Sequence, residues 1–173
     1  MLRQVIASVA AERQRGRAYQ PKFSTRHTLF SWLGGLVAIA LLGILTTLSG
    51  HLLVAAPLGA STVLLFGNPR SPLAQPRNVL LGNLVGAVVS VLAVSWLGVA
   101  PLVMGLAVGL TIGISQRLRC LHPPAGAVAL LGVLLHAHWG YVIFPILVGS
   151  LVLCLVALVF ARITHEPYPQ HWL

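Results

Sequence analysis

Six apolar segments, separated by short polar breaks, follow a polar start of the chain. Four of the segments are long and two are shorter: residues 29–49, 78–98, 101–116 and 140–161, then 51–66 and 122–137. A helix needs about 20 apolar residues to cross a hydrocarbon core of about 30 Å. Both shorter segments carry Pro and Gly near their starts. The pattern predicts an all-α membrane protein with six hydrophobic segments, two of them short helices interrupted by Pro and Gly.

The polar ends of the chain flank this region. Residues 1–27 are predicted to be either a basic helix on the membrane surface or a disordered basic tail. In the helical alternative, four apolar residues share one face: Leu2, Val5, Ile6 and Val9. The transmembrane domain then occupies residues 28–163, and a C-terminal tail occupies residues 164–173.

Basic residues between the segments indicate the topology. They cluster at Arg70 and Arg77, at Arg117 and Arg119, and at Arg162. With the N-terminus inside and six crossings, every cluster lies on the cytoplasmic side, as the positive-inside rule requires. We therefore expect a multi-pass protein of a bacterial inner membrane with both termini cytoplasmic.

The two halves share short sequences in the same order. Pro57-Leu-Gly-Ala recurs as Pro124-Ala-Gly-Ala, and Leu84-Val-Gly recurs as Leu147-Val-Gly. Three segments in each half would place the halves in opposite orientations. This is the 3+3 inverted repeat found in many transporters.

Composition narrows the chemistry. Only 8% of the residues are charged, against roughly 25% in soluble domains, so the surface must face lipid and the basic charge does not indicate nucleic-acid binding. The two acidic residues are Glu12 and Glu166. Carboxylate catalysis and metal binding within the membrane are therefore excluded, and Cys120 and Cys154 read as packing residues. We expect no enzymatic activity, no metal and no cofactor; a small anion suits this interior better than a cation.

In an inverted repeat, the short interrupted segments indicate the binding site. The predicted substrate-binding residues are Gly59, Ala60, Ser61, Thr62, His122, Pro123, Pro124, Ala125 and Gly126. A helix beginning at Pro123 or Pro124 would direct free N–H groups and its positive dipole end at an anion. For each Pro or Gly, ordinary helix packing is the competing interpretation. His122 either donates to the anion or caps a neighbouring carbonyl.

The proline-rich loop at 68–78 has more polar side chains than a connection needs. With one residue of the following segment, they predict an inner vestibule that concentrates anions: Arg70, Ser71, Gln75, Arg77, Asn78 and Asn83. Alternatively, the arginines only fix topology and contact lipid headgroups. Two glycine stripes predict close helix contacts within the chain or between subunits, one at Gly82 and Gly86 and one at Gly105, Gly109 and Gly113.

Residues 57–83 (PLGASTVLLFGNPRSPLAQPRNVLLGN), together with HPPAGAVALL at 122–131, closely resemble the HPP family of membrane proteins. The resemblance implies a small transporter-type membrane protein, and plastid and cyanobacterial members are linked to nitrite transport. Relatives often carry His where this chain has Asn83, which would alter a site that depends on that imidazole. The family is commonly described with four spans, whereas the charge pattern here favours six.

The resulting prediction is a channel or carrier for a small inorganic anion, nitrite first, acting in the lipid bilayer and forming a homo-oligomer. The alternative is a membrane scaffold or sensor subunit that assembles through its glycine stripes. A polar cavity between 59–62 and 122–126 favours transport, whereas a dry interior favours the scaffold.

Overall fold

The computed structural model describes residues 1–19 and 22–172, and this part of the chain is helical and contains no strand. The elements are α1 (Leu2–Tyr19), α2 (Thr25–Ser49), α3 (Ala56–Gly67), η1 (Pro72–Ala74), α4 (Pro76–Leu97), α5 (Pro101–Arg117), α6 (Pro123–Leu134), α7 (Trp139–Tyr141), the π-helical η2 (Val142–Leu147) and α8 (Val148–Thr164). The predicted all-helical class is confirmed.

Three helical stretches in the described part are long and apolar enough to cross a membrane. They are α2, α4 and the continuous run from α7 to α8, with 25, 22 and 26 residues. Helices α3 and α6 have 12 residues each, so both predicted short helices are present. Helix α5 matches the predicted segment 101–116 to within one residue, but its 17 residues are fewer than the roughly 20 that a crossing needs.

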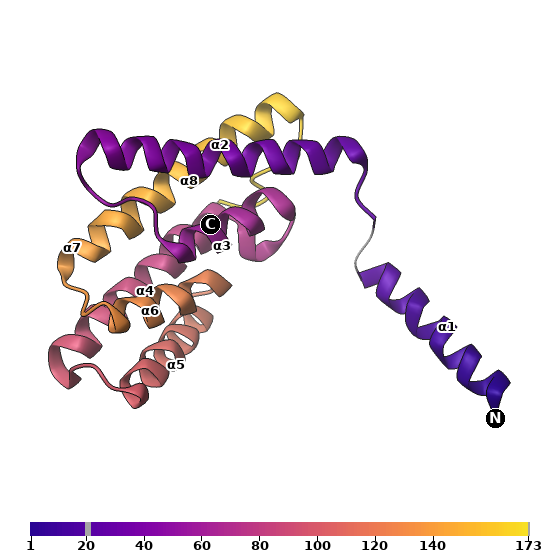
Figure 1. Ribbon diagram of the computed structural model, residues 1–173, viewed down its shortest axis with the longest axis horizontal. Helices are drawn as coiled ribbons and strands as arrows, with labels where there is room; N and C mark the ends of the chain where they lie inside the picture. Colours follow the sequence, from indigo (N-terminus) through magenta and orange to yellow (C-terminus); the bar gives the residue numbers. More distant parts are fainter. Residues whose placement is uncertain (20–21, 173) are drawn as a thin grey trace.

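Helix α1 lies apart from the other helices (Figure 1). Residues 2–19 are thus helical, and their position on a membrane surface stays a prediction. Its residues Val5, Ile6 and Val9 are exposed, whereas the side chain of Leu2 lies outside the described set.

The remaining helices form two groups in contact with each other. In one group, α2 packs against both α3 and α8; in the other, α4, α5 and α6 pack against one another. Figure 1 shows α5 and α6 on the side of α4 that faces away from α2. One apolar core comes mainly from α2, α3 and α8, and another from α4, α5 and α6. The first group therefore combines two consecutive helices with the last helix of the chain, whereas the second group consists of three consecutive helices.

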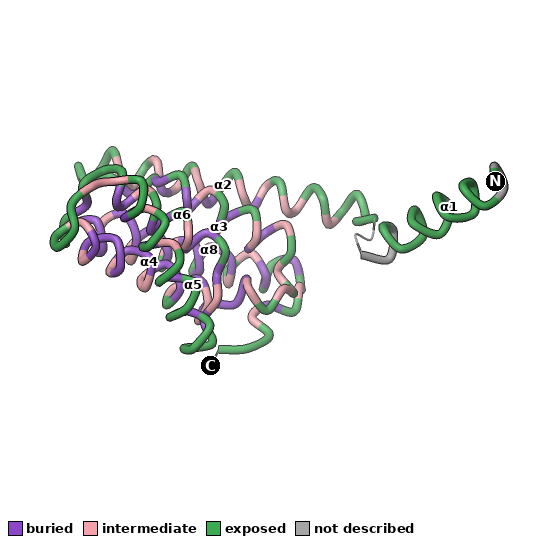
Figure 2. The backbone as a smooth tube through the Cα atoms, turned by 90° about the horizontal axis from the view of Figure 1, so that it is seen from below, coloured by how far each residue is buried: buried purple, intermediate pink, exposed green. Residues whose placement is uncertain are grey.

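Exposed apolar side chains cover the outside of the bundle. They include Trp32, Leu102 and Val159, which are 61%, 84% and 58% exposed. Figure 2 shows buried positions along the inner sides of the helices and exposed positions around the periphery. A surface of this kind requires a lipid environment.

Glycines set the closest approach between helices. On α4, a Cβ at Gly82 would lie 2.8 Å from the carbonyl oxygen of Cys120, and one at Gly86 would collide with that of Ala125. The stripe on α4 is therefore a close contact within the chain. The stripe at Gly105, Gly109 and Gly113 differs, since no described atom lies within 4 Å of a Cβ built there.

Candidate functional site

His122 lies at the centre of a buried group of polar side chains. It precedes the first residue of α6, and its extended backbone turns the side chain towards α3. Its Nε2 lies 2.8 Å from Ser61 Oγ, and its Nδ1 lies 2.9 Å from the carbonyl oxygen of Leu73. A carbonyl oxygen only accepts, so Nδ1 carries a proton and donates to Leu73. In the neutral ring, Nε2 then accepts from the Ser61 hydroxyl.

Asn83 extends this group towards α8. Its Nδ2 donates to Ser150 Oγ at 3.1 Å and, over 3.4 Å, to Ser61 Oγ. Its Oδ1 is buried and has no hydrogen-bond partner among the described residues. An unsatisfied amide oxygen is costly in such surroundings, and exchanging the amide's O and N positions would only transfer the deficit to the other end.

We call Ser61, Asn83, His122 and Ser150 the polar cluster. Their exposed fractions are 0%, 0%, 1% and 1%. They come from α3, α4, the residue before α6, and α8, so the cluster connects the two helix groups. The side chains of Ser61 and His122 contact each other directly, so the open space between 59–62 and 122–126 lies outside the cluster, in the groove lined by Ala60, Pro123 and Pro124.

Close packing against α4 fixes the backbone that carries His122. A Cβ at Gly82 would lie 2.7 Å from the Cβ of His122, so only glycine permits this approach. In the same connection, Cys120 is fully buried. Burial raises the pKa of its thiol, although Ser115 and Arg77 act in the opposite direction. Burial therefore favours the neutral thiol at Cys120.

The first turn of α6 has fewer free N–H groups for an anion than the sequence predicts. The helix begins at Pro123, as expected, but Pro123 and Pro124 have no N–H group. The N–H of Ala125 already donates to the carbonyl oxygen of His122 at 2.9 Å. Fewer N–H groups are therefore available at this helix start than the sequence alone suggests, because its two prolines supply none.

An open groove of about 1290 Å³ lies directly outside the polar cluster. Its walls are formed by α3 and the first turn of α6, including Ala60, Pro123 and Pro124. Residues from other parts of the chain surround its mouth: Lys22, Ser24, His27, Asn68, Arg70 and Glu166. The predicted site residues thus divide between two places, with Ser61 and His122 in the cluster and their neighbours in the groove.

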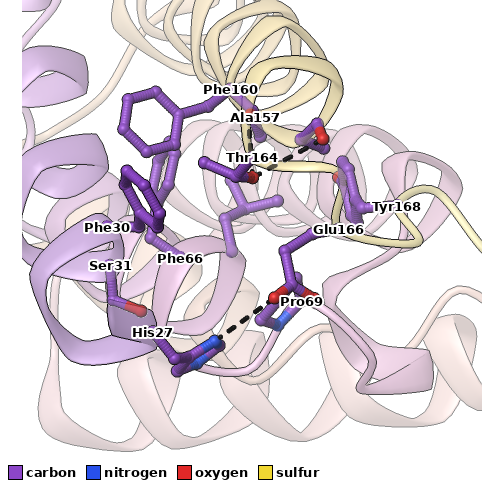
Figure 3. Close-up of a pocket in the computed structure, with 12 residues that line it drawn as sticks. His27, Phe30, Ser31, Phe66, Pro69, Ala157, Phe160, Thr164, Glu166 and Tyr168 are labelled. Atoms are coloured by element: carbon purple, nitrogen blue, oxygen red, sulfur yellow. Dashed lines mark hydrogen bonds and ion pairs between the residues drawn. The ribbon is translucent and has the colours of Figure 1, made fainter. Parts of the chain in front are cut away.

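A smaller pocket of about 40 Å³ adjoins the mouth of the groove. Figure 3 shows His27 directed at the carboxylate of Glu166, below the rings of Phe30, Phe66 and Phe160. The distance from His27 Nδ1 to Glu166 Oε1 is 3.6 Å, and Arg70 lies 3.5 Å from Glu166 Oε2. Glu166 thereby connects the C-terminal tail to α2 and to the loop before α4.

The other predicted site residues have structural contacts. Thr62 donates to the carbonyl oxygen of Leu58 in its own helix. Ala125 packs against Gly86, and a Cβ at Gly126 would lie 3.8 Å from Val108, whereas Gly59 borders open space.

Most of the predicted vestibule holds backbone together. Gln75 donates to the carbonyl oxygens of Pro69 and Ser71, Arg77 to that of Leu118, and Asn78 to that of Leu121. The Ser71 side chain caps η1. Arg70 alone among these residues lines the groove, and Asn83 belongs to the polar cluster.

Sequence reasoning missed Ser150 and the carbonyl of Leu73. Ser150 directly follows the Leu147-Val-Gly repeat, the counterpart of the repeat that Asn83 directly precedes. When the two repeats are aligned, Ser150 corresponds to Ala87 and Asn83 to Ile146, so the repeat gave no signal for Ser150. No side-chain pattern identifies a backbone carbonyl such as that of Leu73.

The lipid-facing surface and the apolar helices define a polytopic α-helical membrane protein. Residues 20–169 match the family described as "HPP, transmembrane region", and the chain belongs to this family. It is 39% identical over 158 residues to a transmembrane protein of Dictyostelium discoideum, and 35% identical over 158 residues to a second one.

Each alignment covers 83% of this chain but only 55% and 50% of the two relatives, so the chain spans about half their length. Their names describe them only as transmembrane proteins. No solved structure matches the chain.

Proposed function

We propose that this protein transports a small inorganic anion across the membrane, with nitrite as the first substrate to test. The observation that carries the proposal is the polar cluster, which presents neutral donors between two helix groups. The described helices α2 to α8 contain no carboxylate that would repel an anion. Donors from His122, Asn83 and the two serines suit a monovalent anion, since a neutral site need not bury an unpaired cation.

Transport through this cluster requires a second conformation. In the closed arrangement, Ser61 and His122 bond to each other, so the anion must replace this bond with bonds to itself. Separation of α3 from α6 would open the cluster towards the groove. Such movement agrees with a 3+3 inverted repeat, α2–α4 and α5–α8, in which the short helices move relative to the rest. Cytoplasmic termini and six crossings are part of this proposal.

Nitrite uptake into proteoliposomes tests the proposal. Asn83→Leu and Ser150→Ala should each reduce uptake at least tenfold, because they remove donors from the cluster. Ser90→Ala is the matched control: Ser90 is equally buried on α4, but it donates to Ala87 in its own helix. Absence of uptake by folded wild-type protein, with nitrate and chloride also tested, would refute anion transport.

The second candidate is a scaffold that assembles through α5. It is favoured by the closely packed polar cluster and by the open glycine stripe at Gly105, Gly109 and Gly113. Under this alternative, wild-type protein forms a defined oligomer and catalyses no anion uptake. Cross-linking in native membranes, measured beside uptake, separates the two candidates.

A further inference from the structure

The groove beside the polar cluster has apolar walls over most of its depth. One wall is the outer face of α3, where Ala60, Val63 and Leu64 lie, and the other is the start of α6, with Pro124 and Ala127. Val63 is 73% exposed. From Ala60 to Gly67 this wall extends about 10 Å along the helix, at 1.5 Å per residue. That length is a large part of one bilayer leaflet, whose hydrocarbon is about 15 Å deep.

The mouth of the groove is basic. Arg70 contacts Glu166 through one nitrogen, but its side chain is 65% exposed, so most of its donors face outwards. Lys22 also lines the mouth and forms no ion pair within the described residues. His27 adds a buried Nε2 that has no hydrogen-bond partner in the same part of the chain. Two permanent cations therefore face a single carboxylate, and that carboxylate is already shared.

We propose that this groove binds an anionic phospholipid, with its phosphate at Lys22 and Arg70 and one acyl chain along α3 and α6. Apolar walls below a basic mouth complement such a lipid in both shape and charge. An inorganic anion would meet the same cations, but it would gain nothing from the apolar walls beneath. The lipid site stands independently of the proposed transport, because it uses none of the polar-cluster residues.

Lipid retention by the purified full-length protein tests the proposal. The protein is exchanged into detergent with phosphatidylglycerol or phosphatidylcholine, and bound lipid is measured by native mass spectrometry. Wild-type protein should retain phosphatidylglycerol preferentially. The double variant Lys22→Gln, Arg70→Gln should bind it more weakly, by about fivefold for each basic residue.

Two controls make the result specific. Arg117→Gln with Arg162→Gln removes the same charge outside the groove and should leave retention unchanged. Ala127→Phe should displace the acyl chain, whereas Leu130→Phe, which alters an exposed residue one turn further along α6, should not. Each variant is first shown to be folded by its thermal unfolding in detergent.

Three outcomes would overturn the proposal. Equal retention of both lipids would show that the site does not select anionic headgroups. Equal loss in the two double variants would indicate a general charge effect. Displacement of the lipid by millimolar inorganic phosphate in wild-type protein would indicate a free-anion site instead. Nitrite uptake is measured separately, so its failure would leave the lipid result intact.

Discussion

Helices α3 and α6 have the same framework but different polar groups. Each has 12 residues, a proline in its first turn and an extended preceding residue, Ala55 or His122, without a side-chain cap. Each also packs near a glycine of a long helix: Gly149 meets Leu58 of α3, and Gly86 meets Ala125 of α6. In α3 the hydroxyls lie within the helix, whereas α6 has its imidazole just before the helix. Two helices of similar length and packing therefore contribute different polar groups to the same cluster.

The largest expected effect is the difference in stability loss between Gly→Ala substitutions at the two glycine contacts. Gly86→Ala should destabilise the protein by about 3 kcal/mol, the upper part of the range for overpacking, because its Cβ meets the backbone of Ala125. Gly149→Ala should cost about 1 kcal/mol, since its nearest obstacle is the flexible end of the Leu58 side chain and the carbonyl oxygen of Leu53 is 3.2 Å away. Thermal unfolding in detergent measures both. Equal losses would mean that the α6 contact is no more rigid than the α3 contact.

The second prediction concerns the polar groups. His122→Phe should destabilise the protein by about 1–2 kcal/mol, because Ser61 and the Leu73 carbonyl lose their partner. Val128→Thr places a hydroxyl in α6 at the repeat position of Ser61. It should cost less, about 0.5 kcal/mol, because that hydroxyl can bond to its own helix. Denaturation in mixed micelles compares them, and a greater loss for Val128→Thr would contradict the role of His122.

Tyr168, outside the membrane-spanning segments, gives a pH-dependent prediction. Its hydroxyl donates to the carbonyl oxygen of Ala74 at 3.1 Å, and burial raises the pKa of the phenol well above its usual value. An acid whose folded pKa is raised stabilises the fold below its unfolded pKa of about 10, and this contribution falls as the pH rises above that value.

Stability should therefore fall more steeply above pH 10 in wild-type protein than in Tyr168→Phe. At neutral pH the variant should lose about 1 kcal/mol, the contribution of one hydrogen bond. Unfolding temperatures between pH 8 and pH 11 provide the measurement. Parallel pH profiles would show that Tyr168 does not titrate on unfolding in this range.

The smallest expected effect is a gain in stability. Gly109→Ala should stabilise an isolated chain by about 0.5–1 kcal/mol, because alanine favours the helix and nothing in the described structure obstructs its Cβ. If α5 assembles with another copy, the same change should instead weaken the oligomer. Unfolding and cross-linking, measured on one preparation, decide between these results.

The helices were largely predictable, because apolar runs of about 20 residues form helices in a membrane. The predicted helix start at Pro123 is confirmed, whereas Pro57 and Pro76, in the first turns of α3 and α4, were not predicted as helix starts. The second segment, predicted at 51–66, was placed too early: α3 begins only at Ala56, since apolar composition does not determine where a helix begins. The 3+3 inverted repeat and its orientation stay predictions.

The candidate site was predictable only in part. The two motifs do meet, through Ser61 and His122, because both begin short helices that pack near α4. The sequence could not show that the side chains of Gln75, Arg77 and Asn78 bond to backbone carbonyl oxygens. The same residue types would also be expected in an anion-binding vestibule. The groove was also unpredicted: it joins Lys22, Arg70 and Glu166, which are far apart in the chain.

The side-chain amide of Gln75 connects the C-terminal tail to the loop next to the polar cluster. Gln75 Oε1 accepts from the backbone N–H of Gln170, while Nε2 of the same amide donates to the carbonyl oxygens of Pro69 and Ser71. Leu73, in the same loop, accepts from His122. The fluorescence of a label attached near residue 170 should therefore change when the polar cluster moves. A bulky fusion at the same place should slow that movement.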